Sequence, residues 1–191
     1  MAKKGGRANF SETGRKLVHL FYGIFLGVGV LTLGKEESIA LLAGILALGL
    51  VAIAHREKIP PANFLLEKFS RKEEPIGQGP VSFTLGALLA ISFFGRTEAG
   101  WGIIFLGIGD SLSAIFGRLS GARRKSWQGF LAGFAGNIAS GYFFSPFPAI
   151  LLLISAGAVS VFEFFAPKEI DDNLLIPAIG AFFLSLGGSF G

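Results

Sequence analysis

The chain alternates between long apolar stretches and short polar connections from residue 17 almost to its end. An α-helix rises about 1.5 Å per residue, so about 20 apolar residues cross the ~30 Å hydrocarbon core of a bilayer. Seven of the stretches reach or approach that length, and we expect each to form a membrane-spanning helix. They comprise residues 17–34, 38–54, 77–95, 99–117, 127–144, 147–166 and 174–190.

The longest polar connection, residues 55–76, has a helical pattern of its own. After a pair of prolines, apolar residues follow at Ala62, Leu65, Leu66 and Phe69, which is the i, i+3, i+4, i+7 spacing of an amphipathic helix. We therefore predict a short helix that lies in the cytoplasmic interface of the membrane with its apolar side in lipid. Packing of this side on the helix bundle is an equally simple alternative.

Composition supports an all-α integral membrane protein. Of the 191 residues, 51% are hydrophobic and 28 are glycine, and the mean hydropathy is +0.62. A soluble domain of this length is less apolar, whereas glycine is frequent where membrane helices pack closely. No connection is long enough to separate two folded units, so we expect residues 1–191 to form a single polytopic membrane domain. The chain has no cysteine, which excludes disulfides and thiolate metal sites.

The positive charges predict the orientation of these helices. When the seven stretches are threaded alternately across a membrane, only Lys35 and Arg96 of the 17 Lys and Arg residues fall on the side opposite the N-terminus. Lys and Arg are enriched in the cytoplasmic connections of membrane proteins. We therefore expect a basic cytoplasmic segment at residues 1–14, a cytoplasmic connection at 55–76, and a C-terminus outside.

Asp110 lies inside the apolar run 100–117, where an ionised side chain costs at least ~3 kcal/mol. A residue kept at such a cost usually serves a function, or else it is neutralised by an ion pair. Arg118 is on the same helix face, about 12 Å farther along the axis. Asp110 is therefore either a catalytic or metal-binding residue, which we favour, or the structural partner of Arg118.

Further acidic residues are expected at the cytoplasmic ends of the last two helices. Glu163 lies near the end of the sixth stretch, and Asp171, Asp172 and Asn173 precede the seventh. Mg²⁺ takes hard oxygen ligands, commonly one or two carboxylates together with phosphate oxygens. With Asp110, these acids are candidate ligands of Mg²⁺, whereas the group at 171–173 could instead cap the last helix.

Basic residues gather at the same expected ends, which suits a phosphorylated ligand because phosphoryl transfer depends on positioning and charge neutralisation. Ser126 directly precedes a predicted helix, whose N-terminus can bind phosphate. The alternative is that the cations only anchor the helices in the interface. His19, one helical turn after Lys16, is a candidate base, phosphate donor or buried structural histidine. The candidate phosphate-binding residues are Arg15, Lys16, Arg118, Arg123, Arg124, Lys125 and Ser126.

Three blocks of sequence occur in an order that is typical of one family. They are RKLVH at 15–19, GIGDSLSAIFGRLSGARRKSWQG at 107–129, and E-(x)7-DDNLLIP at 163–177. In these blocks the chain resembles the CTP-dependent polyprenol kinases. That family includes dolichol kinase, phytol kinase and CTP-dependent diacylglycerol kinase, and the phosphatidate cytidylyltransferases are its distant relatives.

The resemblance implies a Mg²⁺-dependent transfer of the γ-phosphate of CTP to a membrane alcohol. It makes Asp110 a metal ligand and assigns the binding of phosphates to Arg118, Lys125 and Ser126. The acidic block would complete the nucleotide or metal site through Asp171, Asp172 and Asn173. The chain is much shorter than the large eukaryotic dolichol kinases, so it would correspond to their catalytic core.

The function expected from the sequence is a membrane lipid kinase that converts CTP and a long-chain isoprenoid alcohol into a lipid monophosphate and CDP at the cytoplasmic face. Its candidate catalytic residues are Asp110, His19 and Lys125. The alternatives are a cytidylyltransferase that acts on a lipid phosphate and a diacylglycerol kinase. A small transporter fits less well because the polar residues cluster on one side of the membrane. The scattered basic residues do not favour nucleic-acid binding.

Overall fold

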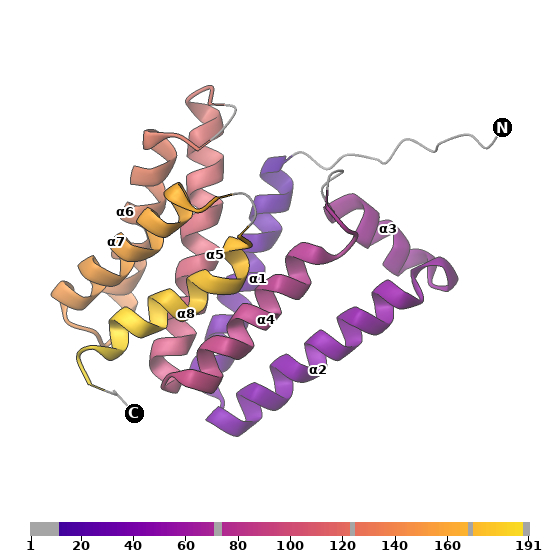
Figure 1. Ribbon diagram of the computed structural model, residues 1–191, viewed down its shortest axis with the longest axis horizontal. Coiled ribbons are helices and arrows are strands. Elements are labelled where there is room, and N and C mark those ends of the chain that lie inside the picture. Colours follow the sequence, from indigo (N-terminus) through magenta and orange to yellow (C-terminus); the bar gives the residue numbers. More distant parts are fainter. Residues whose placement is uncertain (1–11, 71–73, 123–124, 168–169, 189–191) are drawn as a thin grey trace.

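The computed structural model describes residues 12–70, 74–122, 125–167 and 170–188, and every regular element in these ranges is a helix (Figure 1). Each of the seven predicted apolar helices is present, and so is the short helix predicted in the 55–76 connection. The elements are α1 (Glu12–Thr32), α2 (Lys35–Ala54), the 3-10 turn η1 (Arg56–Lys58), α3 (Pro60–Phe69), α4 (Gln78–Phe93), α5 (Arg96–Leu119), α6 (Trp127–Phe144), α7 (Ala149–Phe165) and α8 (Asp172–Ser185).

Three of these helices are long and apolar enough to cross a membrane, judged by length and composition alone. They are α1, α2 and α5, whereas α4, α7 and α8 are apolar but shorter. The shortest, α8, has 14 residues. The protein is therefore an all-helical chain with three candidate membrane spans in its described residues, and this composition favours an association with membranes.

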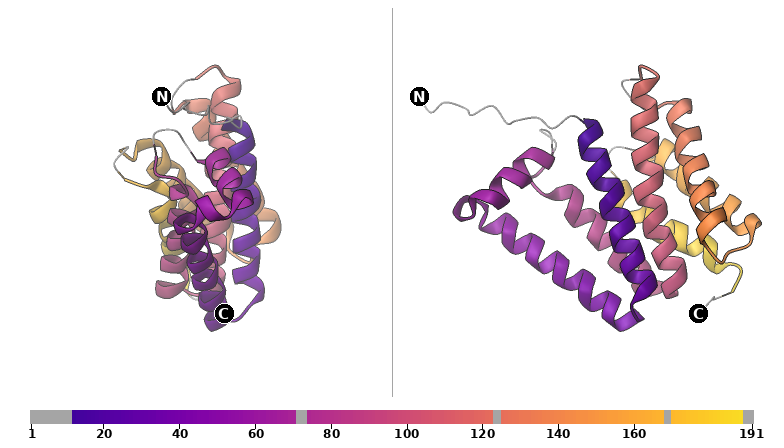
Figure 2. Two further views of the ribbon diagram at one scale, coloured as in Figure 1. Left: turned by 90° about the vertical axis from the view of Figure 1, so that its right-hand side faces the viewer. Right: turned by 180° about the vertical axis from the view of Figure 1, so that it is seen from behind.

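Helix α5 forms the centre of the molecule and packs against α1, α6 and α8 (Figures 1 and 2). It is in close contact with α1 at two glycines, because a Cβ added to Gly23 would lie only 2.6 Å from the Cα of Gly107. Any larger residue at either position would force the two helices apart. This contact fixes the register of α1 on α5 and sets the N-terminal turns of α1 opposite Asp110.

The helix connections alternate between two ends of the molecule, which we name as they are oriented in Figure 1. The upper end contains the start of α1 and the connections α2–α4, α5–α6 and α7–α8. The lower end contains the connections α1–α2, α4–α5 and α6–α7. Most of the predicted basic segment, residues 1–11, lies outside the described residues.

At the lower end, two cations join two neighbouring helix corners. The Lys35 ammonium at the start of α2 donates to the carbonyl of Phe94 at the end of α4, at 3.0 Å. The Arg96 guanidinium at the start of α5 donates to the carbonyl of Leu33 at the end of α1, at 3.1 Å. Cations stabilise the free carbonyls at helix C-termini, so these reciprocal bonds tie the α1–α2 corner to the α4–α5 corner.

Helices α2 and α5, which follow these two corners, have a glutamate in the same place in their first turn. Glu98 occupies the third position of α5 and is 1% exposed. Its carboxylate lies against Gly95, where an added Cβ would be 2.2 Å from Glu98 Oε2, and Glu37 lies against Gly34 in the same manner. A glutamate at this position of a helix commonly turns back toward the first backbone N–H groups. The two carboxylates therefore lie beside the first residues of α2 and α5.

Helix α2 diverges from α1 toward its C-terminal end, and η1 and α3 connect it to α4 (Figure 2). The turn before α4 requires glycine, because Gly77 has φ of +80° and an added Cβ would lie 2.4 Å from Cδ1 of Ile53. Leu66 of α3 is half-buried beside this turn. The side chains of Ala62, Leu65 and Phe69 lie outside the described residues, so the rest of the predicted apolar stripe on α3 stays a prediction.

Candidate functional site

A cleft of about 210 Å³ opens at the upper end, between α1, α4, α5 and the start of α8. Its apolar wall is built by Val18, Tyr22, Pro75 and Pro80. The polar residues that line it include Arg15, Lys16, His19, Gln78, Asp110, Asp172 and Asn173. Six of these seven were candidate site residues in the sequence, and they come from segments far apart along the chain. The fold therefore brings the first, second and third sequence blocks to one cavity.

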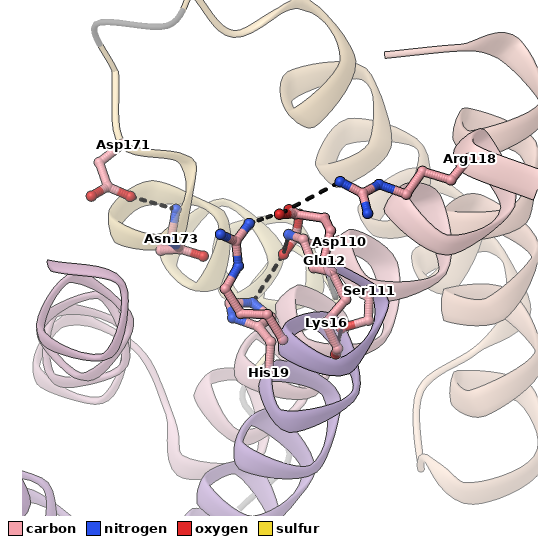
Figure 3. A network of polar contacts seen from close by, with 9 residues as sticks. Glu12, Lys16, His19, Asp110, Ser111, Arg118, Asp171 and Asn173 are labelled. Carbon is pink, nitrogen blue, oxygen red and sulfur yellow. Dashed lines mark hydrogen bonds and ion pairs between the residues drawn. The ribbon is translucent and has the colours of Figure 1, made fainter. Parts of the chain in front are cut away.

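Asp110 forms the centre of a buried polar cluster with two residues of α1 (Figure 3). The Lys16 ammonium donates a hydrogen bond to Asp110 Oδ2, and His19 Nε2 lies 3.1 Å from the same oxygen. Asp110 is 8% exposed and Lys16 is 7% exposed. Burial of opposite charges requires good pairing, and here the acid is paired across two helices at the wall of a cleft.

The backbone of α1 is also bound to α5 at this point. Ser111 Oγ donates to the carbonyl of Lys16 at 2.9 Å, and both residues are buried. The residue after Asp110 thus holds the backbone of the residue whose side chain pairs with Asp110. Both bonds together fix the position of the Lys16 ammonium relative to the carboxylate.

The structural alternative for Asp110 was a hydrogen bond or ion pair with Arg118, but the structure pairs Asp110 with Lys16 of α1 instead. Arg118 lies in the exposed last turn of α5, and its Nη2 is 3.5 Å from Glu12 Oε2. Glu12 also accepts a hydrogen bond from Arg15. The physical reason is the close contact of α1 with α5, which places Lys16 nearer to Asp110 than a residue two turns along the same helix. Arg118 consequently contributes to a second, more exposed charged group above the cleft.

The start of α8 combines a helix cap with two cleft residues. Asp171 Oδ1 accepts a hydrogen bond from the backbone N–H of Asn173 at 3.1 Å, which confirms the capping role that we considered for it. Its other oxygen accepts a longer hydrogen bond of 3.4 Å from the Gln78 amide. Asp171 is not among the residues that line the cleft, whereas Asp172 and Asn173 are.

Asp172, which precedes the predicted 174–190 span, is electrostatically coupled to the buried cluster. Burial raises the pKa of its carboxyl above the ordinary value, and the negative charge of Asp110 raises it further. The positive charges of Lys16 and Lys125 oppose this increase. Asp110 and Asp172 therefore form a pair of acids near enough to repel each other when both are ionised.

Lys125 and Ser126 have structural contacts outside the cleft wall. The Lys125 ammonium donates to the backbone carbonyls of Glu163 and Ala166, the latter at 3.4 Å, at the end of α7. Ser126 is the N-cap of α6, and its hydroxyl accepts from the Gly129 N–H at 3.1 Å. Neither residue lines the cleft. Arg123 and Arg124 lie outside the described residues.

Glu163 is buried behind the cluster and does not line the cleft. Its side chain is hydrogen-bonded to Ser113 and is close enough to Asp110 for the two charges to interact. In the part of the chain that the structure describes, no group of three or more His, Asp and Glu side chains could hold a metal ion. The four acids predicted as metal ligands are thus not assembled into one protein-only site, and Mg²⁺ would need phosphate oxygens as additional ligands.

Two features of the site were not inferred from the sequence. The first is the pairing of Lys16 with Asp110, which depends on the register of α1 on α5. The second is Tyr22, whose hydroxyl donates to Thr84 Oγ1 at 2.7 Å at the apolar wall of the cleft. Tyr22 could have been found from helical spacing. Lys16, His19 and Tyr22 are three residues apart along α1, so they lie on nearly one face of the helix.

Comparison with protein-family models, with characterised proteins and with solved structures finds no match to this chain.

Proposed function

We propose that the protein is a membrane lipid kinase that transfers the γ-phosphate of CTP to a long-chain isoprenoid alcohol. The observation that carries this proposal is the buried Lys16–Asp110–His19 cluster at the wall of a cleft, at the cation-rich end of an apolar helix bundle. A cleft with this lining offers positive charge to phosphate and carboxylate to a divalent cation. Its position at the end of apolar helices suits an acceptor that arrives from lipid. The resemblance of the three sequence blocks to CTP-dependent polyprenol kinases supports the choice of nucleotide and acceptor.

In this proposal all seven apolar helices cross the bilayer, and α3 lies at the cytoplasmic interface. The upper end of the molecule faces the cytoplasm together with the N-terminus, and α8 ends on the outer side. The distribution of Lys and Arg supports this orientation. A helix of 14 residues such as α8 spans only about 21 Å, so the bilayer would thin locally or flanking residues would extend toward the interface.

The basic residues would receive the triphosphate of CTP. Lys16 and Arg15 line the cleft, and charge-assisted bonds to phosphate oxygens are among the stronger polar contacts in proteins. A phosphate oxygen would compete with Asp110 for the Lys16 ammonium. Binding of the nucleotide would thereby loosen the ion pair and make the carboxylate available. Arg118 and Arg15 would extend the positive surface above the cleft.

The acids of the cleft fit a magnesium ion that is shared with phosphate. Asp110 and Asp172 raise each other's cost of ionisation, and a divalent cation would relieve this repulsion. Mg²⁺ commonly takes one or two carboxylates and completes its shell with phosphate oxygens and water. When bound, the ion would neutralise the charge of the transferring phosphate. Asp110 and Asp172 are the residues that would hold it.

His19 is the candidate base for the hydroxyl group of the acceptor. It lies in the cleft and contacts Asp110, which can stabilise the imidazolium that forms when the ring takes a proton. The hydroxyl oxygen would form a bond to the γ-phosphorus as the bond to the β-phosphate oxygen breaks, and CDP would leave. Asp110 remains the alternative acceptor of this proton.

An activity panel of nucleotides and acceptors tests the proposal. Purified protein in lipid nanodiscs would be incubated with CTP, ATP or GTP and with a polyprenol, diacylglycerol or a lipid phosphate, and the products would be identified by mass. We expect the lipid monophosphate and CDP only from CTP and the polyprenol. Pyrophosphate release with the lipid phosphate would assign the protein to the cytidylyltransferases instead. Absence of any nucleotide-dependent product would overturn the proposal.

A further inference from the structure

We propose that an apolar groove beside the cleft holds the hydroxyl-proximal segment of the acceptor's hydrocarbon chain. This inference rests on the proposed function, because it assigns the tail of the same substrate. The groove has a volume of about 110 Å³ and lies between α2 and α4, with α3 at one side. Its walls include Ile45, Leu46, Ile53, Leu66 and Val81.

The groove adjoins the cleft. Tyr22 and Pro80 line both cavities, so these two residues form the boundary that the tail of a molecule with its polar head at Asp110 would cross. His19 and Tyr22 both pack edge-on against Phe83, with ring centroids 4.8 and 5.3 Å apart. The candidate base and the residue at the boundary thus share one aromatic support. A ligand in both cavities would extend from the polar cluster into an apolar environment.

The polar groups at the boundary are already satisfied by each other. The Tyr22 hydroxyl donates to Thr84 Oγ1 at 2.7 Å, and the Thr84 hydroxyl donates to the Pro80 carbonyl at 2.8 Å. An apolar chain that fills the groove therefore leaves none of these groups unpaired, whereas a polar ligand would find few partners. This favours a hydrocarbon tail over a sugar or a second phosphate.

The size of the groove limits how much of the tail it can hold. A cavity of about 150 Å³ with aliphatic walls accommodates a molecule the size of benzene. A groove of about 110 Å³ therefore suits a segment of about one isoprene unit, and the remainder of the chain would lie in the bilayer. The outward side of α2 is compatible with lipid, because Leu48, Leu50 and Val51 are exposed. The site would then recognise the first isoprene unit of the alcohol and not the length of its chain.

Two glycines of α2 provide a matched pair of variants. Gly49 lines the groove, and a Cβ added there meets no atom within 4 Å. Gly44 lies on the same helix, also has open space at its Cβ, and does not line the groove. Both positions thus have room for a Cβ, and leucine at either one improves the helix propensity of α2. Only Gly49→Leu would fill the groove.

We expect Gly49→Leu to raise the KM for the polyprenol by at least about tenfold and to leave the KM for CTP unchanged. Gly49→Ala should have an intermediate effect, and Gly44→Leu should behave as the wild type. Thermal unfolding of all three variants controls for displacement of α2. Equal KM values for the polyprenol in Gly49→Leu and Gly44→Leu would overturn the inference.

Photo-cross-linking separates this inference from the proposed function. A prenol with a diazirine in its first isoprene unit should label peptides of α2 and α4 that contain residues 45–53 and 80–84. Labelling there without any phosphotransfer would refute the kinase and keep the groove as an isoprenoid site. Phosphotransfer with labelling only elsewhere would refute the groove and keep the kinase. Equal labelling of these peptides by a diazirine phospholipid would show a site for bilayer lipid in general and would also overturn the inference.

Discussion

Helix α5 carries two buried carboxylates, and the two have different surroundings. Glu98, in the first turn, lies against the backbone at Gly95. Asp110, just past the middle of the helix, meets Lys16 and His19 of another helix at the wall of a cleft. A carboxylate beside the start of its own helix lies close to the free backbone N–H groups there. A carboxylate paired with side chains of another helix at the wall of a cleft can exchange them for a ligand.

Lys16 at the upper end and the two cations Lys35 and Arg96 at the lower end differ in the same way. At the lower end, Lys35 and Arg96 donate to backbone carbonyls at the ends of neighbouring helices. At the upper end, Lys16 donates to a side-chain carboxylate inside the cleft. The comparison teaches that charge alone does not identify a site in this protein. The partner of each charge, backbone or side chain, separates the residues that hold the fold from those that can act on a substrate.

The largest expected effect comes from removing the charge of one acid of α5 at a time. Asp110→Asn should reduce CTP-dependent phosphorylation of a polyprenol by about 100-fold or more, because a group that positions the metal or the base is lost. Glu98→Gln, the control, should keep activity within about twofold, because Glu98 does not line the cleft. Both rates would be measured on protein of verified fold in nanodiscs. Comparable loss in both variants would remove the distinction between the two acids.

A smaller effect is expected when one cation at each end is replaced by methionine, which keeps the apolar stem. Lys16→Met removes the ammonium that pairs with the buried Asp110 carboxylate and should lower the stability by about 3 kcal/mol. Lys35→Met removes one exposed hydrogen bond to a carbonyl and should cost about 0.5 kcal/mol. Thermal unfolding in one detergent would give both values. The comparison fails if Lys35→Met is the more destabilising change.

The double variant Lys16→Met, Asp110→Asn sharpens this result. Once the charge of Asp110 is removed, methionine at position 16 no longer deprives a buried negative charge of its ammonium partner. The second substitution should therefore recover most of the stability lost in Lys16→Met, while activity stays absent. No recovery would mean that the loss in Lys16→Met comes from packing and not from the ion pair.

The smallest expected effect concerns the pH dependence of stability through Asp172. Its folded pKa is raised above the ordinary value of 3.8 by burial and by Asp110. The folded state is therefore favoured most below pH 3.8, and this contribution is lost as the pH rises through the raised folded pKa. Asp172→Asn should raise the melting temperature at pH 7 by about 2–3 °C at most. The difference from the wild type should disappear in acid, and a difference that grows in acid would contradict the assigned direction.

Much of the fold could be predicted from the sequence, because the length of each apolar stretch and the short polar connections determine where helices begin and end. Each of the seven apolar helices and the short helix α3 was expected, although α1 starts earlier, at Glu12, and α8 stops earlier, at Ser185. The number of helices that cross a membrane is harder to predict from the sequence. Three helices are long and apolar enough to do so, whereas the shorter apolar helices could span only a bilayer that adapts to their length.

The candidate site was predicted in part. Asp110 could be found because an acid in an apolar run has a cost that requires an explanation. Its partner could not be found, because the contact between Gly23 and Gly107 that selects Lys16 over Arg118 depends on how two helices pack. Lys125 looked like a phosphate ligand, yet its ammonium reaches the carbonyls at the end of α7. Which distant backbone group a side chain reaches depends on how the helices pack, and the spacing of residues along the chain does not show it.

The bond from Ser111 to the carbonyl of Lys16 has a mechanical consequence. Since α1 is fastened to α5 through its backbone as well as through the Lys16 side chain, these two helices move as one body near Asp110. Any widening of the cavity to admit a bulky nucleotide must then come from its other side, where α4 and the start of α8 form the wall.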